Sequence, residues 1–404
     1  MNILIAEPMA AAGIELLKAQ PGWNVMVSNP KEYQNCLAEA DALIVRSAVK
    51  VTKEVLEKAP RLRVIGRAGV GVDNVDLDAA TAAGVLVMNT PGGNAISVAE
   101  HTIALMLALA RSIPQASFST KSGKWEKKKF LGHEVRGKTL GIIGLGSIGR
   151  EVVRRALAFE MRILAVDPYV NPQVAADLGV ELVELPKLLA ESDYISLHTA
   201  LTPETRKVLS REAFEQMKPG VCIINCARGE MIDEEALVEA LRSGKVAGAA
   251  LDVFKPEPPP PDLPLLAFDN VLATPHIAGS TEEAQEIVGV RIAEQIVEYL
   301  KNGVAINAVN MPALTPEQYR TVGPYIGLAE RLGSLAAQIA TGNPKSVRLV
   351  YSGKIGDGSK HLIRNGGLVG LLNRWLSHRA TLVNAMQLAT QRELAVEERH
   401  TSKA

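Results

Sequence analysis

Residues 139–150 of the chain read TLGIIGLGSIGR, an apolar run that leads into three glycines spaced as G-x-G-x-x-G: Gly144, Gly146 and Gly149. In a strand–turn–helix unit the first glycine permits a tight turn, the second lets the backbone approach a pyrophosphate, and the third lets the helix pack on the strand. The following segment, Arg150–Glu160, contains no Pro or Gly and is expected to be that helix. Its positive end would hold the diphosphate of a dinucleotide.

Asp167 lies about twenty residues beyond the glycine loop, at the end of the next apolar run. An acidic side chain at this place can accept hydrogen bonds from both ribose hydroxyls and repels a 2′-phosphate. The expected cofactor is therefore NAD rather than NADP, and Ser147 and Ile148 of the same loop belong to the candidate cofactor site. The alternative is a structural glycine turn followed by an unrelated strand-end aspartate.

Apolar runs rich in Val, Ile and Leu alternate with helical segments on both sides of this loop. The runs are continuous, which is typical of parallel strands covered on both faces by helices. The expected strands are Ile3–Ala6, Val25–Ser28, Ala42–Arg46, Arg63–Gly66 and Val85–Met88 in a first series, and Thr139–Gly144, Arg162–Asp167, Tyr194–His198, Val221–Cys226, Ala247–Asp252 and Val271–Thr274 in a second. The sequence thus predicts an α/β fold with two doubly wound parallel sheets, a flavodoxin-like lobe and a Rossmann lobe.

Two helices connect the expected lobes. Ser97–Arg111 is apolar nearly all round, with Ser97 as the expected N-cap and Glu100 as its capping-box partner. Such a helix must be buried, either in the core of a lobe or in a two-fold dimer seam, and we favour the dimer. Glu282–Asn302 is amphipathic and leads away from the second lobe. We expect a substrate-binding domain of residues 1–96 and 283–310, a Rossmann NAD-binding domain of residues 97–282, and a partial C-terminal domain of residues 311–404.

The pattern changes after Pro312. A helix is expected over Gly327–Thr341, a strand over Val347–Tyr351, a second helix over Leu368–Gln387 and a polar tail over Glu397–Ala404. The C-terminal segment therefore has an α+β character that differs from the alternating pattern before it.

Charge and cysteine content exclude several classes of protein. Lys plus Arg equals Asp plus Glu at 44 each, so no net field would recruit nucleic acid or a membrane surface. The three cysteines, Cys36, Cys222 and Cys226, lack the spacing of a zinc site, which indicates no metal centre and a reducing, cytoplasmic compartment. The longest apolar stretch, Ile103–Ala110, is too short to cross a bilayer. The expected partners are a small-molecule substrate and further copies of this chain.

Three polar side chains follow apolar runs of the second series: Arg228, Glu257 and His276. Ligands of open α/β sheets bind outside the carboxyl ends of the strands, so these side chains share the edge where a substrate would lie. Oxidation of a secondary alcohol needs a base for the hydroxyl proton and a cation for a neighbouring carboxylate, beside the nicotinamide. Taken alone, each of the three also fits a structural or solvent-exposed role.

Longer motifs connect these residues to a known family. They are Gly66-Arg67-Ala68-Gly69-Val70-Gly71-Val72-Asp73-Asn74, Met88-Asn89-Thr90-Pro91, Gly123-Lys124-Trp125-Glu126, Asn225-Cys226-Ala227-Arg228-Gly229 and Ala249-Ala250-Leu251-Asp252-Val253-Phe254. With them the chain resembles the D-isomer-specific 2-hydroxyacid dehydrogenases over nearly its whole length, and most closely those acting on 3-phospho-D-glycerate. The resemblance implies NAD-dependent oxidation of that substrate to 3-phosphohydroxypyruvate, the first step of L-serine biosynthesis. The alternatives are a hydroxypyruvate or glyoxylate reductase of the same family and an NAD-binding, corepressor-like scaffold.

The resemblance also implies roles for individual residues. It assigns Arg228 to the substrate carboxylate, His276 to acid–base catalysis, and Glu257 to the carboxylate that pairs with His276. Such a carboxylate favours the protonated imidazole and fixes its orientation. The resemblance places Arg46, Ser47, Arg67, Gly69, Asn94, Lys127, Arg228 and His276 around the substrate, and Thr199, Cys226, Ala227, Arg228, Asp252 and His276 beside the cofactor. Lys127 stands where related chains have arginine, so a substrate phosphate would meet a point charge rather than a bidentate fork.

The C-terminal segment Pro324–Gln387 resembles the first part of an extra domain found in long members of the family. A small regulatory domain follows in those members and is expected to be absent here. The apolar faces of Gly327–Ile339 and Leu368–Leu388 are then expected to be incompletely covered.

Overall fold

The structure is a computed structural model that describes residues 1–340, 342, 344–352, 360–376 and 379–401. The chain divides into two compact units. Unit 1 comprises residues 1–93 and 285–404, and unit 2 comprises residues 94–284. The described part of the C-terminal segment therefore groups with the first unit.

Unit 1 contains a five-stranded parallel sheet in the order β2-β1-β3-β4-β5, which is the flavodoxin-like order. Its strands are β1 (Asn2–Ile5), β2 (Asn24–Val27), β3 (Ala42–Val45), β4 (Val64–Arg67) and β5 (Leu86–Met88). The connecting helices are α1 (Ala11–Lys18), η1 (Tyr33–Glu39), α2 (Lys53–Glu57) and α3 (Leu77–Ala82). All five expected strands are confirmed to within one or two residues.

The long helix α11 (Glu282–Asn302) covers one face of this sheet. Val288, Ile292 and Ile296 are buried against strand residues such as Ile5 and Ile44. The opposite face carries a second cluster that includes residues of η1, α2 and α3. Because both faces are covered by apolar side chains, the strands have the continuous apolar sequences from which they were predicted.

Unit 2 contains a seven-stranded parallel sheet in the order β12-β11-β10-β9-β6-β7-β8. Its strands are β6 (Thr139–Ile143), β7 (Arg162–Val166), β8 (Glu181–Leu182), β9 (Tyr194–Leu197), β10 (Val221–Asn225), β11 (Val246–Leu251) and β12 (Val271–Ala273). This is the strand order of dinucleotide-binding folds, with one strand added at the β12 edge. Six strands were expected and are confirmed; β8 was missed because a run of two residues gives no periodic signal.

Helices cover both faces of this second sheet. They are α4 (Ala95–Ala110), α5 (Ile113–Lys121), η2 (Lys127–Phe130), α6 (Ser147–Ala158), α7 (Pro172–Asp177), α8 (Leu185–Glu191), α9 (Arg211–Gln216), η3 (Gly229–Met231), α10 (Glu234–Arg242) and η4 (Pro264–Ala267). The expected capping of α4 by Ser97 is wrong, because the helix begins two residues earlier with Asn94 as N-cap. The Ser97 hydroxyl lies instead 2.8 Å from the Thr281 hydroxyl, a partner distant in sequence.

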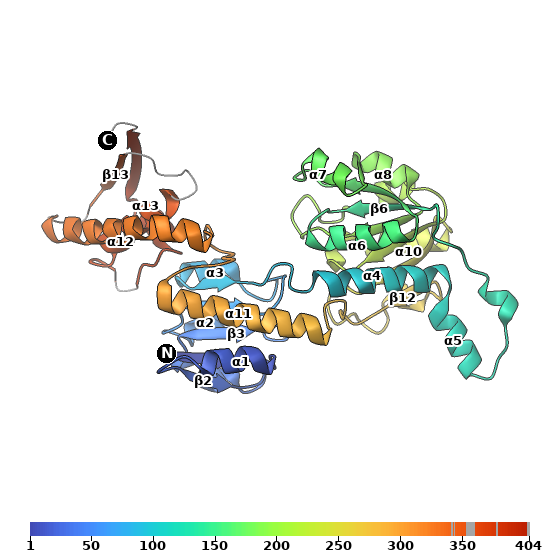
Figure 1. The fold of residues 1–404 in the computed structure, drawn as a ribbon, viewed down its shortest axis with the longest axis horizontal. Helices are drawn as coiled ribbons and strands as arrows, with labels where there is room; N and C mark the ends of the chain where they lie inside the picture. Colours follow the sequence, from blue (N-terminus) through green and yellow to red (C-terminus); the bar gives the residue numbers. More distant parts are fainter. Residues whose placement is uncertain (341, 343, 353–359, 377–378, 402–404) are drawn as a thin grey trace. The chain divides into compact units, whose positions relative to one another are not determined.

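α5 and the chain that follows it extend away from the body of unit 2 (Figure 1). Large apolar side chains are exposed along this segment: Phe118 is 75%, Trp125 is 84% and Leu131 is 90% exposed. In the part of the chain that is described, no single helix is long and apolar enough to span a membrane; α4 and α5 meet that test only as a pair, with a 64° bend between them.

The C-terminal segment differs most from expectation. Its elements are α12 (Pro316–Ile339), β13 (Ser346–Ser352), α13 (Lys360–Leu372), α14 (Ala385–Gln391) and β14 (Ala395–Thr401). α12 begins eleven residues before the predicted helix, because Thr315 and Gln318 form a capping box and Pro324 is accommodated inside the helix. The single helix expected over Leu368–Gln387 is wrong, since α13 ends at Leu372 and α14 is separate. The expected tail is also wrong over residues 397–401, which belong to β14, and residues 402–404 lie outside the described chain.

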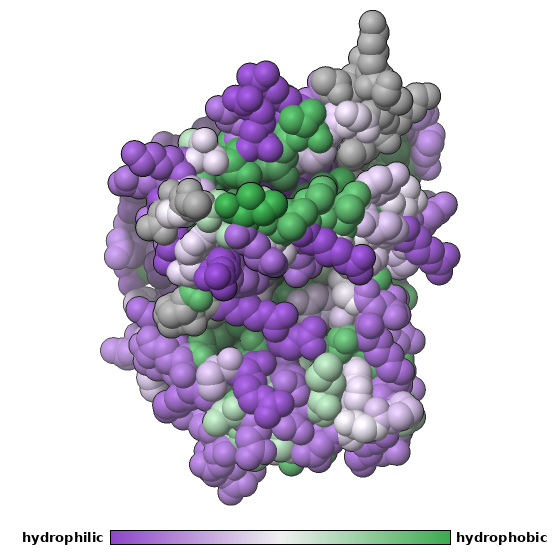
Figure 2. Space-filling model, turned by 90° about the vertical axis from the view of Figure 1, so that its left-hand side faces the viewer, coloured by the Kyte–Doolittle hydropathy of each residue, from purple (hydrophilic) through white to green (hydrophobic). Residues whose placement is uncertain are grey.

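An apolar stripe along α12 is exposed, as the sequence predicted. Leu328, Leu332, Leu335 and Ile339 recur at helical spacing and are each more than half exposed. Figure 2 shows a band of hydrophobic side chains on this part of the molecule. The matching prediction for α13 is wrong, because its apolar residues, such as Leu368, are buried against α12 and α14.

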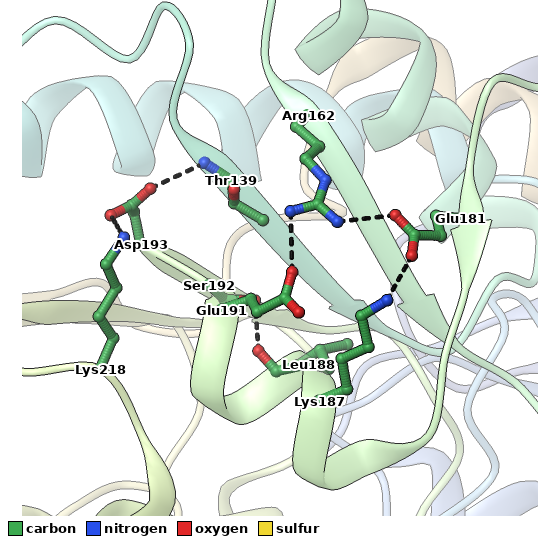
Figure 3. A network of polar contacts seen from close by, with 9 residues as sticks. All are labelled: Thr139, Arg162, Glu181, Lys187, Leu188, Glu191, Ser192, Asp193 and Lys218. Carbon is green, nitrogen blue, oxygen red and sulfur yellow. Dashed lines mark hydrogen bonds and ion pairs between the residues drawn. The ribbon is translucent and has the colours of Figure 1, made fainter.

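Charged side chains link the amino ends of strands in the second sheet (Figure 3). The Arg162 guanidinium contacts Glu181 at 2.7 Å and Glu191 at 2.8 Å. The Asp193 carboxylate accepts hydrogen bonds from the Thr139 backbone N–H at 2.9 Å and from the Lys218 ammonium group at 2.6 Å. These contacts stabilise the sheet at the edge opposite to the one where ligands bind in such folds.

Asp193 gives a test of this network. Burial raises the pKa of Asp193, but the hydrogen bonds from Lys218 and Thr139 outweigh it and lower the pKa below the usual 3.8. Because the pKa of Asp193 is lower in the folded protein than in the unfolded chain, the carboxylate stabilises the fold at pH values above its unfolded-state pKa. This contribution is lost as the pH falls through the folded-state pKa. We therefore expect Asp193→Asn to lower the free energy of unfolding by about 1 to 3 kcal/mol at pH 7. In urea titrations the difference from the wild type should shrink as the pH falls below about 4; an equal difference at every pH would contradict the role of the charge.

Candidate active site

The glycine loop after β6 has the shape that a dinucleotide requires. Gly144 has a positive φ of 98°, and a Cβ atom there would lie 2.7 Å from the His198 carbonyl group. A Cβ on Gly149 would collide with the Gly144 carbonyl oxygen. A Cβ on Gly146, the N-cap of α6, would meet no atom within 4 Å. Gly144 and Gly149 are thus closely packed against neighbouring backbone atoms, whereas the space beside Gly146 is open. A pyrophosphate can therefore approach the start of α6.

Asp167 is joined directly to this loop. Its carboxylate accepts hydrogen bonds from the Leu145 backbone N–H at 2.8 Å and from the Tyr169 backbone N–H at 2.9 Å. The structure therefore places the acidic side chain beside the glycine loop, where the sequence expected it. Its contact with a ribose remains a prediction.

The other expected cofactor residues lie at the same carboxyl edge. The Thr199 backbone nitrogen is 2.8 Å from the position of a Cβ on Gly144, so Thr199 borders the loop. Cys226 and Ala227 follow β10 and are each only 9% exposed. Burial raises the pKa of the Cys226 thiol to about 12, so this cysteine is a neutral thiol at physiological pH.

His276 and Glu257 form a direct pair. Nδ1 of His276 lies 2.7 Å from Oε2 of Glu257, and Oε1 of Glu257 accepts a hydrogen bond from the Phe254 backbone N–H at 3.1 Å. Burial raises the pKa of Glu257, but the contact with His276, the backbone hydrogen bond and the Arg228 charge together hold it below its usual value. With Nδ1 engaged, Nε2 is the imidazole nitrogen that a substrate can use.

His276 has an unusual backbone conformation that Asp252 supports. Its φ is 53°, in the left-handed region. The Asp252 carbonyl accepts the His276 N–H at 2.8 Å, and the fully buried Asp252 carboxylate accepts the N–H groups of Ile277 and Ala278, each at 2.9 Å. The turn that carries His276 is therefore fixed by hydrogen bonds to a rigid strand end.

Arg228 is held in a turn that packs against the Glu257 loop. The buried Asn225 amide donates to the Arg228 carbonyl at 2.9 Å, and its oxygen accepts the Ala227 N–H at 2.9 Å. A Cβ on Gly229 would collide with the Phe254 backbone, so glycine is needed where the two loops meet. The structure thus brings Arg228, Glu257 and His276 to one sheet edge.

The expected substrate residues of unit 1 share the carboxyl edge of the first sheet. Arg46 and Ser47 follow β3, with Ser47 exposed. Arg67 ends β4, and its guanidinium occupies the space that a Cβ on Gly69 would fill. Gly69 has a φ of 151°, a backbone conformation that glycine adopts more easily than other residues.

The two remaining expected substrate residues lie in unit 2. The side-chain nitrogen of Asn94, the N-cap residue of α4, lies 2.6 Å from the position of a Cβ on Gly279, in the turn after His276. Lys127 is exposed in η2, within the segment that extends from the body of the unit. The structure therefore brings Asn94 close to the turn that follows His276 and leaves Lys127 on the projecting segment.

Two residues that support the site, His101 and Asn225, were not among the expected site residues. Nε2 of His101 on α4 lies 3.2 Å from the Thr274 hydroxyl and 3.5 Å from the Asp252 carboxylate. Asn225 is a fully buried amide at the end of an apolar strand. Both His101 and Asn225 are polar residues within a largely apolar helix or strand. Because a buried polar side chain needs a hydrogen-bond partner, this pattern could have identified the two residues from the sequence.

Comparison with known protein families agrees with this geometry. Residues 103–278 match the D-isomer specific 2-hydroxyacid dehydrogenase NAD binding domain. Residues 321–404 match the D-3-phosphoglycerate dehydrogenase intervening domain.

Individual relatives extend the likeness to the whole chain. A D-3-phosphoglycerate dehydrogenase from Archaeoglobus fulgidus is 47% identical over 98% of this chain and 76% of its own length. The corresponding protein from Methanocaldococcus jannaschii is 48% identical over 100% of this chain and 77% of its own length. A D-lactate dehydrogenase from Aquifex aeolicus, solved with NAD and lactic acid, has a TM-score of 0.68 at 32% identity and covers 78% of this chain and 100% of its own.

Proposed function

The chain belongs to the D-3-phosphoglycerate dehydrogenases within the D-isomer specific 2-hydroxyacid dehydrogenase family, and from this membership we propose that it oxidises 3-phospho-D-glycerate with NAD to 3-phosphohydroxypyruvate. This reaction would supply the first intermediate of L-serine synthesis. The observation that carries the proposal is the His276–Glu257 pair at 2.7 Å, with Arg228 at the same sheet edge as the open glycine loop.

We assign the cofactor to the glycine loop, the amino end of α6 and Asp167. The nicotinamide, when bound, accepts the hydride from the substrate's C2 carbon. Gly146 would allow the pyrophosphate to approach the backbone, and Asp167 would receive the ribose hydroxyls. Asp167 already accepts backbone hydrogen bonds, so its charge is fixed in place and would repel a 2′-phosphate.

The chain's own side chains would perform the remaining steps. Arg228 binds the substrate carboxylate and stabilises negative charge on the reacting oxygen. Nε2 of His276 accepts the proton of the C2 hydroxyl as the C2–H bond breaks. Glu257 holds the imidazole through Nδ1 and stabilises the imidazolium that forms. The products are 3-phosphohydroxypyruvate, NADH and a proton that later leaves His276.

Initial rates with the wild-type enzyme test this proposal. 3-Phospho-D-glycerate, D-glycerate and D-2-hydroxyglutarate are each assayed with NAD and with NADP. The highest kcat/KM is expected for 3-phospho-D-glycerate with NAD. A preference for either unphosphorylated acid would contradict the substrate assignment, and a preference for NADP would contradict the role of Asp167.

Lys127 is proposed to contact the substrate phosphate. Lys127→Ala should raise the KM for 3-phospho-D-glycerate by about tenfold and change that for D-glycerate much less, because only the first carries the phosphate charge. Lys121→Ala, which removes an exposed lysine at the end of α5, is the matched control. Equal losses with both substrates would indicate a structural effect of Lys127.

We also propose that the protein acts as a homodimer. The exposed side chains of Phe118, Trp125 and Leu131 support this, because neighbouring large apolar residues on a projecting segment are typical of a surface that another chain covers. The free thiols of Cys36, Cys222 and Cys226 support a reducing, cytoplasmic location.

A further inference from the structure

One buried carboxyl group holds most of the backbone of the loop Arg46–Val49. Glu7 follows β1 and is only 5% exposed. Its Oε1 atom accepts the N–H groups of Arg46 at 2.8 Å and Val49 at 2.9 Å, and its Oε2 atom accepts that of Ala48 at 3.1 Å. A single side chain thus satisfies three of the four backbone donors of this loop.

A second side chain holds the same loop through its carbonyl groups. The Asn74 amide nitrogen donates to the Arg46 carbonyl at 2.8 Å and to the Val49 carbonyl at 2.7 Å. Further along, the Val51 N–H donates to the Asn74 carbonyl at 2.8 Å. Glu7 and Asn74 therefore hold the first and last residues of the loop from two different neighbouring segments, which follow β1 and β4.

The loop lies where a ligand is expected to bind. In a sheet of order β2-β1-β3-β4-β5 the strand order reverses between β1 and β3, and ligands bind outside the carboxyl ends at such a point. Ser47 is exposed there, and the Arg46 guanidinium is partly exposed and donates to the Pro8 carbonyl at 3.2 Å. A loop whose backbone groups are already satisfied keeps one shape, so a ligand need not order it on binding.

We propose that Glu7 and Asn74 are positioning residues that preform Arg46–Val49 as a substrate-binding loop, so that Arg46 and Ser47 meet an anionic substrate in a fixed geometry. This inference rests on the proposed function. Because the backbone N–H groups of Arg46, Ala48 and Val49 are taken by Glu7, the loop binds the substrate through its side chains and the Ser47 N–H.

Glu7→Gln tests the inference with almost no change in side-chain volume. Whichever way the new amide is oriented, a nitrogen replaces one acceptor oxygen and leaves at least one loop N–H without a partner. We expect the KM for 3-phospho-D-glycerate to rise about tenfold, while kcat at saturating substrate stays within about twofold, because the catalytic residues lie elsewhere. Asn74→Ala removes the hydrogen bonds to the Arg46 and Val49 carbonyl groups. It should likewise raise the KM for 3-phospho-D-glycerate and leave kcat almost unchanged.

Asp41→Asn is the matched control. Asp41 is also a buried carboxyl group, 7% exposed, that accepts a backbone N–H, from Asn2 at 2.7 Å. It precedes β3 at the opposite, amino edge of the same sheet. We expect a lower melting temperature for this variant and an unchanged KM.

Amide hydrogen exchange measured on the same proteins separates the outcomes. Residues 46–49 should exchange faster in Glu7→Gln than in the wild type or in Asp41→Asn. Faster exchange in Glu7→Gln with an unchanged KM would overturn the inference. A rise in KM that is equal in Asp41→Asn and Glu7→Gln would also overturn it. Neither result would affect the proposed function. A wild-type enzyme that does not turn over 3-phospho-D-glycerate would overturn the proposed function, and the inference with it.

Discussion

Replacing His276 by alanine is expected to lower kcat by about a hundredfold or more, which is the usual loss when acid–base help is removed. Nε2 of His276 is the group proposed to take the hydroxyl proton, and water cannot replace it in the same fixed position. Glu257 would remain without its imidazole partner. NADH binding, measured by fluorescence, should stay near the wild-type value, because the glycine loop and Asp167, which are proposed to hold the cofactor, are unchanged in this variant.

His133→Ala is a matched control, since His133 is an exposed histidine of the same unit. Its kcat should equal that of the wild type. If His276→Ala retained full turnover, His276 would have no part in proton transfer and the site assignment would have to change.

Replacing Arg228 by alanine is expected to lower kcat/KM by about a thousandfold, with losses in both KM and kcat. A carboxylate clamp acts in the ground state and also in the transition state, where charge develops on the reacting oxygen. Arg228→Lys should recover only part of the loss, because lysine keeps the charge but not the planar fork. Steady-state rates over a range of 3-phospho-D-glycerate concentrations separate the two parameters.

Arg206→Ala provides the control, because Arg206 is an exposed arginine of the same unit. It should leave both parameters unchanged. A variant Arg228→Ala that showed only a lower melting temperature, with normal kinetics, would make this arginine structural.

Strands and glycine turns of this protein could be predicted because their signals are local. A buried parallel strand is a continuous apolar run, and the spacing of Gly144, Gly146 and Gly149 is set by the turn and the helix that follow. The family resemblance then identified Arg228, Glu257 and His276, and the structure places them together at the expected sheet edge.

Features that depend on distant partners could not be predicted in this way. Serine is a common N-cap residue, but the Ser97 hydroxyl is hydrogen-bonded to the hydroxyl of Thr281, far along the chain. The charged residues of β14 are typical of a polar tail in sequence. They form a strand because their backbone pairs with β13. Glu7 acts through backbone groups of another loop, so no spacing in the sequence reveals it.

The proposed transfer of hydride from C2 of 3-phospho-D-glycerate to NAD can be followed with an isotope label. 3-Phospho-D-glycerate carrying deuterium at C2 is incubated with the wild-type enzyme and NAD, and the reduced cofactor is analysed by mass spectrometry. We expect every NADH formed to carry the deuterium, 3-phosphohydroxypyruvate to accumulate in equal amount, and His276→Ala to slow this transfer. Formation of NADH without deuterium, or no NADH from this substrate, would contradict the proposed transfer.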